Sequence, residues 1–107
     1  MATSKLETLE KRIRALKGRL TRSGDLRPGT LSVQYRNPVE KKTPFNQISY
    51  THKGRSRSEY VRPENLKAVR REIETYKRFK STVEELVALS IEASRLRFGA
   101  KSGTTEG

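Results

Sequence analysis

Side chains that can hydrogen-bond to nucleic acid recur at alternate positions in the middle of the chain. An arginine guanidinium can fork onto guanine, an amide can pair with adenine, and a hydroxyl can contact phosphate or either base. Lysines in flanking loops would neutralise the backbone phosphates that pass them. The candidate nucleic-acid-binding residues are Ser32, Gln34, Arg36, Lys41, Lys42, Gln47, Ser49, Thr51, Lys53, Arg55 and Arg57. An ordinary solvated sheet surface is the alternative interpretation of the same pattern.

The charge of the chain indicates a polyanionic partner. Its 107 residues include 24 Lys and Arg against 12 Asp and Glu, a formal net charge of +12. Residues 1–62 hold 15 of the basic and 5 of the acidic residues, whereas residues 63–107 hold 9 and 7. Because such an excess repels itself unless it meets a polyanion, we expect the first part to contact nucleic acid. The nearly balanced second part is typical of a protein–protein element.

Groups that carry catalysis or hold metals are sparse. The chain has no Cys, and its single His, His52, stands in a predicted turn. Glu84, Glu85 and Glu92 have no His or Cys beside them to form an acid–base or metal site. We therefore expect a protein that is not an enzyme and that uses no metal and no cofactor. No apolar run approaches about 18 residues, so we also expect no membrane partner and a cytoplasmic protein, nucleoid-associated if it binds DNA.

The apolar spacing predicts two helices of unequal length. Leucines and an isoleucine at heptad spacing predict an N-terminal helix over 4–23, opened by a capping box of Ser4 and Glu7. Pro63 suits the first turn of a second helix, which nothing interrupts until about residue 98. The composition of residues 99–107 predicts a disordered tail.

Alternation of apolar and polar residues predicts a sheet between the helices. The three expected antiparallel strands cover residues 30–36, 45–51 and 55–61. The fold class is therefore α+β: an N-terminal heptad helix, a three-stranded antiparallel sheet and a long C-terminal helix that forms a coiled-coil-like pair or dimer. We expect residues 1–98 to form a single helix–sheet–helix domain.

The turn between the second and third strands decides which side chains share a face of the sheet. A three-residue loop that ends at Gly54 would pair Ser49 with Arg57 and keep both on the polar face. A two-residue turn of Lys53 and Gly54 would instead set Tyr50 opposite Arg57. It would also set Ile48 opposite Glu59, which mixes charge into the apolar face. Since a slip of one residue moves every side chain to the other face, we predict the three-residue loop.

The same choice of loop decides on which face of the sheet the aromatic residues lie. With the three-residue loop, the apolar face would consist of Leu31, Val33, Tyr35, Ile48, Tyr50 and Tyr60. We therefore expect the tyrosines in the core, and stacking of bases on them is the less favoured alternative. The basic face of the first helix is a further alternative contact for nucleic acid.

The long helix carries more apolar surface than the first helix can cover. At 1.5 Å per residue it spans about 50 Å, against about 30 Å for the first helix. A second copy of the chain is the simplest partner for the remainder, and a helix bent over its own sheet is the alternative. The predicted homodimer interface comprises Val83, Leu86, Val87, Ile91, Leu96 and Phe98.

Three segments carry a resemblance to a known family. They are the sequences GTLSVQYR at 29–36, YTHKGRSRSEYVRPE at 50–64 and YKRFK at 76–80. Together with the heptad helix, they resemble a family of short uncharacterised prokaryotic proteins often encoded near transposases on mobile elements. Many members carry a cysteine-rich, metal-binding knuckle between the first two strands. Residues 37–44 lack cysteine here, so the resemblance implies mobile DNA as the context and no metal role.

The combined expectation is a non-enzymatic accessory or regulatory protein that binds double-stranded DNA through the polar-basic face of its sheet. Two alternatives stay open. The protein could be an adaptor whose long helix binds a partner protein such as a transposase or another mobile-element protein, or it could bind structured RNA.

Overall fold

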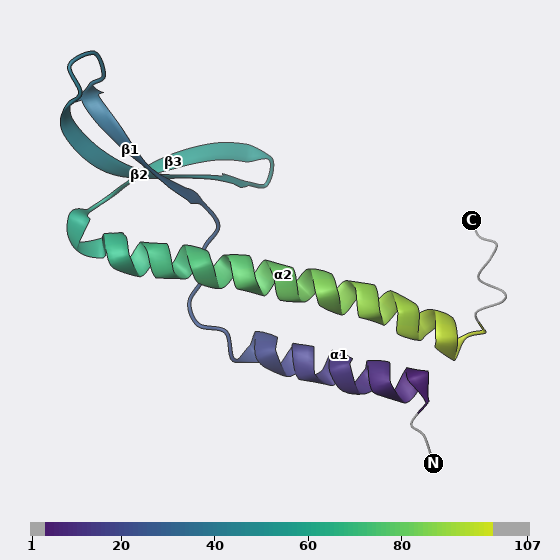
Figure 1. The fold of residues 1–107 in the computed structure, drawn as a ribbon. Coiled ribbons are helices and arrows are strands. Elements are labelled where there is room, and N and C mark those ends of the chain that lie inside the picture. The colour runs from purple at the N-terminus through teal and green to yellow at the C-terminus, as the bar shows by residue number, and fades with distance from the viewer. Residues whose placement is uncertain (1–3, 100–107) are drawn as a thin grey trace. The chain divides into compact units, whose positions relative to one another are not determined.

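The computed structural model describes residues 4–99 and shows the predicted α+β order of elements (Figure 1). The elements are α1 (Lys5–Thr21), β1 (Thr30–Asn37), β2 (Lys42–His52), β3 (Arg55–Val61), a 3₁₀ turn (Pro63–Asn65) and α2 (Leu66–Arg97). Strand β2 begins earlier than the alternation indicated, at Lys42 rather than Phe45. The tail predicted over 99–107 lies outside the described residues from 100 onward.

The chain divides into two compact units, so its prediction as a single domain stays a prediction. One unit contains the chain up to Ser23 together with the part from Phe79 onward, and the other is Gly24–Arg78. The helix α2 contributes its second half to the first unit and its first half to the second unit. Within residues 4–99, neither helix has the length and apolarity needed to cross a membrane.

The helical unit is an antiparallel pair of α1 and the second half of α2 (Figure 1). Helix α1 starts with the predicted capping box, in which the Ser4 hydroxyl accepts from the Glu7 amide. Its apolar stripe is buried at Leu16, which has no exposed surface. Three ion pairs join the helices: Lys5–Glu92 at 3.0 Å, Arg12–Glu85 at 2.9 Å and Arg97–Glu10 at 3.4 Å. Because these charges are partly exposed, the buried leucine stabilises the pair more than the ion pairs do.

The sheet unit packs one face of the sheet on the first half of α2. The strands are antiparallel in the order β1-β2-β3, so β2 is central. The core consists of Ile48, Val61 and Ile73, with Leu31, Leu66 and Val69 packed against it. The other face of the sheet has no helix over it within this unit. One side of the sheet therefore packs on α2, and no helix of this unit covers the other side.

The β2–β3 turn differs from the prediction. His52 pairs with Arg55, which leaves only Lys53 and Gly54 in the turn, with φ angles of 53° and 76°. Positive φ at both central residues defines the type I′ turn, whose twist matches that of antiparallel strands. The three-residue loop was therefore wrong, and every side chain of β3 lies on the opposite face from the one predicted.

The packing of the sheet unit can be tested by substitution of Gly29, which directly precedes β1. A Cβ at this position would lie 2.6 Å from Cδ1 and Cγ1 of Ile48, and its φ of 151° disfavours other residues. We expect Gly29→Ala to lower the free energy of unfolding by about 1–3 kcal/mol. Gly24→Ala is the matched control, because a Cβ there meets nothing within 4 Å. Urea unfolding of both variants checks this, and equal stabilities would contradict the close packing.

Candidate nucleic-acid interface

The sheet side that faces away from α2, called the outer face below, is polar and almost uncharged. Side chains alternate between the two sides along each strand, and residues paired across strands share a side. The outer face is the side that holds Ser49, whereas the core residue Ile48 lies on the other side. The outer face consists of Thr30, Ser32, Gln34, Arg36, Phe45, Gln47, Ser49, Thr51, Ser56, Ser58 and Tyr60. Six residues of the predicted binding set lie here: Ser32, Gln34, Arg36, Gln47, Ser49 and Thr51. Arg36 is the single cation among them.

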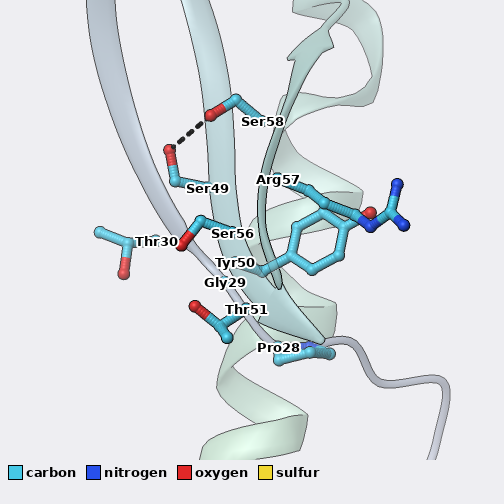
Figure 2. A pocket seen from close by; sticks show the side chains of 9 residues that line it. All are labelled: Pro28, Gly29, Thr30, Ser49, Tyr50, Thr51, Ser56, Arg57 and Ser58. Atoms are coloured by element: carbon cyan, nitrogen blue, oxygen red, sulfur yellow. Dashed lines mark hydrogen bonds between the residues drawn. The ribbon is translucent and has the colours of Figure 1, made fainter. Parts of the chain in front are cut away.

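Hydroxyl groups gather at one end of the outer face. Figure 2 shows an open depression whose lining includes the hydroxyls of Thr30, Ser49, Thr51, Ser56 and Ser58. The hydroxyls of Ser49 and Ser58 lie 3.4 Å apart across the two strands. Small uncharged donors and acceptors of this kind can contact base edges or phosphate oxygens without a large desolvation cost.

Two amides continue this polar surface along the strands. The Gln47 amide donates to the Ser49 hydroxyl at 3.5 Å, and the Gln34 amide donates to the Ser32 hydroxyl at 3.1 Å. These contacts hold each amide along its strand while its oxygen stays available as an acceptor. An amide presented from a flat sheet can form the paired hydrogen bonds by which adenine is recognised.

Arg55 and Arg57 do not belong to the outer face, which corrects the prediction that placed them there. Figure 2 shows Arg57 beside Tyr50, on the opposite side of the strands from the serine hydroxyls. Arg55 pairs with His52 and therefore lies on the same side as Arg57. The two-residue turn is the physical cause, because it shifts β3 by one position relative to the predicted register.

A small ionic cluster explains why the helix side of the sheet tolerates charge. Glu59 lies opposite Ile48, yet its carboxylate accepts from the Tyr50 hydroxyl at 2.6 Å and pairs with Arg27 at 3.2 Å. The Arg27 guanidinium also lies 5.0 Å from the centre of the Tyr50 ring. The hydrogen bond from Tyr50, together with Arg27, lowers the pKa of Glu59, and the bond to Glu59 raises the pKa of Tyr50. Glu59 is therefore a partnered anion at the rim of the core.

Apart from Arg36, the cations of the predicted binding set stand at the two ends of the sheet and not on the outer face. Lys41 and Lys42 lie at the β1–β2 connection, where Lys42 pairs with Glu40 at 3.0 Å. Lys53, Arg55 and Arg57 lie at the β2–β3 hairpin. Within the part of the chain that the structure describes, these last three residues form no ion pair. The hairpin end therefore carries three cations that no ion pair among the described residues neutralises, although Arg57 also lowers the pKa of Glu59 through its charge.

An aromatic pair lies on the outer face, where the prediction had placed none. Tyr60 was expected in the core, but it pairs with Gln47 and 57% of its surface is exposed. Its ring centre lies 6.4 Å from that of Phe45, and the Arg36 guanidinium lies 5.4 Å from the Phe45 ring centre. The two-residue turn of Lys53 and Gly54, the alternative that the sequence pattern disfavoured, is the one that places Tyr60 on this face.

The predicted dimer residues fall into two groups on α2. Val87, Ile91 and Phe98 are 51%, 49% and 72% exposed. Val83 and Leu86 are half-buried. Leu96 is about one turn from Ala93, which is buried against α1, so it belongs to the side that packs on α1. Only the first group forms an open apolar stripe.

The basic residues of α1, the other surface considered for nucleic acid, are dispersed around the helix. Arg12 is engaged with Glu85, whereas Lys11, Arg14, Lys17 and Arg19 are exposed. They lack the neighbouring polar groups and flat geometry of the sheet. This helix is suited to additional phosphate contacts.

Comparison with known proteins finds no matching family model, no matching curated protein and no matching solved structure. Residues 4–99 also hold no group of three or more His, Cys, Asp or Glu side chains that could bind a metal ion. The function is therefore inferred from the surfaces of the chain itself.

The β2–β3 register can be tested with engineered disulfides, since the chain has no cysteine of its own. Ser49 and Ser58 are paired, with hydroxyls 3.4 Å apart, so Ser49→Cys with Ser58→Cys should form a disulfide under mild oxidation. Ser49→Cys with Arg57→Cys should stay reduced, because the two side chains lie on opposite faces. Thiol titration and mass spectrometry measure the result. Oxidation of the second pair alone would restore the three-residue loop.

Proposed function

We propose that this protein is a non-enzymatic accessory or regulatory protein that binds double-stranded DNA through the outer face of its sheet. The observation that supports the proposal is a polar face with a single cation, Arg36, between two cationic ends of the sheet. Such an arrangement is typical of protein–DNA interfaces, in which phosphate contacts position the protein and uncharged donors and acceptors contact the bases.

The dimensions of β2 suit this arrangement. Its 11 residues extend for at most about 37 Å at the rise of an antiparallel strand. The major groove of B-DNA is about 12 Å wide, so a sheet laid in it extends beyond both phosphate backbones. The lysines of the β1–β2 connection and the cations of the hairpin would then meet phosphates on either side.

The net charge adds a long-range contribution. The +12 charge draws the protein to any polyanion and makes its affinity depend strongly on salt. The resemblance to a family encoded near transposases supports DNA of a mobile element as the partner. Structured RNA is the competing ligand, and duplex DNA and hairpin RNA of matched sequence distinguish the two.

Two classes of substitution should separate phosphate contacts from base contacts. Lys53→Ala, in the turn at the hairpin end, should weaken binding to all sequences and reduce the salt slope by about one, because one phosphate contact is lost. Gln47→Ala should lower discrimination between sequences and leave the slope unchanged. Fluorescence anisotropy across a salt series, with specific and random duplexes, measures both quantities.

Arg71→Ala is the matched control for the loss of one cation. Helical spacing places Arg71 on the side of α2 turned away from Ile73 and the sheet, so its removal should leave the salt slope unchanged. Equal effects of Arg71→Ala and Lys53→Ala would mean that only net charge matters. DNA binding that does not depend on salt, or the absence of DNA binding, would favour an adaptor that acts through α2.

We also propose that two copies associate through the open apolar stripe of α2. Val87, Ile91 and Phe98 lie within about 40° of one another around the helix, on the side opposite α1. A monomer would leave this stripe in water along roughly three turns. Because the stripe is short, the dimer should depend on protein concentration.

The charges beside the stripe favour an antiparallel second copy as its partner. Glu84 and Arg95 are eleven residues apart, about three turns, so they share one flank of the stripe. Neither forms an ion pair within residues 4–99. In a two-fold antiparallel pair, each flank meets the same flank of the partner in reverse, so Glu84 meets Arg95 twice.

Charge reversal tests this dimer. Glu84→Arg should weaken self-association by at least about tenfold, because it places like charges together at both ends. The swap of Glu84→Arg with Arg95→Glu should restore it, since the two-fold recreates both pairs. Sedimentation equilibrium over a range of protein concentrations measures the dissociation constant. A swap that fails to restore association, or a monomer at every concentration, would contradict the proposal.

A further inference from the structure

The outer face ends in a row of three side chains, one from each strand. Arg36 comes from β1, Phe45 from β2 and Tyr60 from β3. The rings of Phe45 and Tyr60 are 6.4 Å apart and inclined at 50°, and Arg36 lies over Phe45 at 5.4 Å. This row stands on the same side of the sheet as the hydroxyls and amides of the proposed DNA contact.

The exposure of Tyr60 is not explained by packing. Its surface is 57% exposed, and its hydroxyl forms no hydrogen bond within residues 4–99. Phe45 is half-buried, so the pair presents the exposed ring of Tyr60 beside a ring that the sheet holds in place. A core role would have placed Tyr60 on the side of Ile48, where the helix α2 covers the sheet.

We infer that Arg36, Phe45 and Tyr60 form a stacking platform for an unpaired base. Aromatic rings on an open sheet bind bases through their faces, and a neighbouring guanidinium adds a cation–π contact and a charge for the phosphate. A paired base inside a duplex does not offer its face, so the platform requires a base outside the stack. The inference rests on the proposed function and makes it more specific: the preferred ligand is duplex DNA that continues into unpaired nucleotides.

The polar and aromatic parts of the outer face are continuous, which favours such a mixed ligand. Gln47 lies opposite Tyr60, and Ser49 with Ser58 is the next pair on the same face of these strands. One face therefore passes from a stacking surface to hydrogen-bonding groups within two residues. A duplex resting on the polar part would bring its unpaired end to the rings.

Binding to a blunt duplex and to the same duplex with a short single-stranded overhang tests the platform. Aminopurine in the overhang reports stacking through the loss of its fluorescence. Tyr60→Leu keeps apolar bulk but removes the ring, and Tyr60→Phe keeps the ring. The wild type and Tyr60→Phe should bind the overhang duplex more tightly than the blunt one and quench aminopurine. Tyr60→Leu should lose at least about fivefold more affinity for the overhang duplex than for the blunt duplex.

Tyr35→Leu is the matched control, because Tyr35 is an aromatic residue on the opposite face of the same sheet. It should leave the preference for the overhang intact, and circular dichroism confirms that each variant is folded. Equal binding of Tyr60→Leu and wild type to the overhang duplex, with blunt-duplex binding retained, would overturn the platform alone. Failure of the wild type to bind either duplex would overturn the proposed function as well.

Discussion

The type I′ turn of Lys53 and Gly54 is the constraint on which the surface of this protein depends. With two residues in the turn, Ser58 pairs with Ser49 and Tyr60 with Gln47, while Arg57 lies beside Tyr50. Strand β3 therefore places its serines and Tyr60 on the outer face, and Arg55, Arg57 and Glu59 on the other. A third residue in the turn would exchange the two sets on β3.

This division changes how the positive charge can act. A uniformly basic face would bind any polyanion along its whole area, whereas here the cations lie at the two ends of the sheet. The cations would then position the phosphate backbone of the DNA. The polar part of the outer face between them would be free for contacts that depend on sequence or on base pairing. The +12 net charge and the neutrality of the outer face are thus complementary features.

Local sequence patterns predicted the helices and strands well. The register of β3 could not be predicted from them, because it depends on contacts between residues far apart in the sequence. The Ser4–Glu7 capping box, the bounds of β3 and the burial of Ile48 all follow from spacing along the chain. The register was mispredicted because Glu59 opposite Ile48 looked like an unpaired charge in an apolar face. Arg27, from the segment before β1, neutralises it. The exposed Tyr60 was missed for the same reason.

The account makes one central claim, that the outer face set by this turn is the side of the sheet that meets nucleic acid. Side-chain NMR signals during titration with duplex DNA test it most directly. The account predicts shifts at Gln34, Gln47 and Ser58, with Ile48 and Val33 on the other face unchanged. Shifts confined to the helices, or equal on both faces of the sheet, would contradict it.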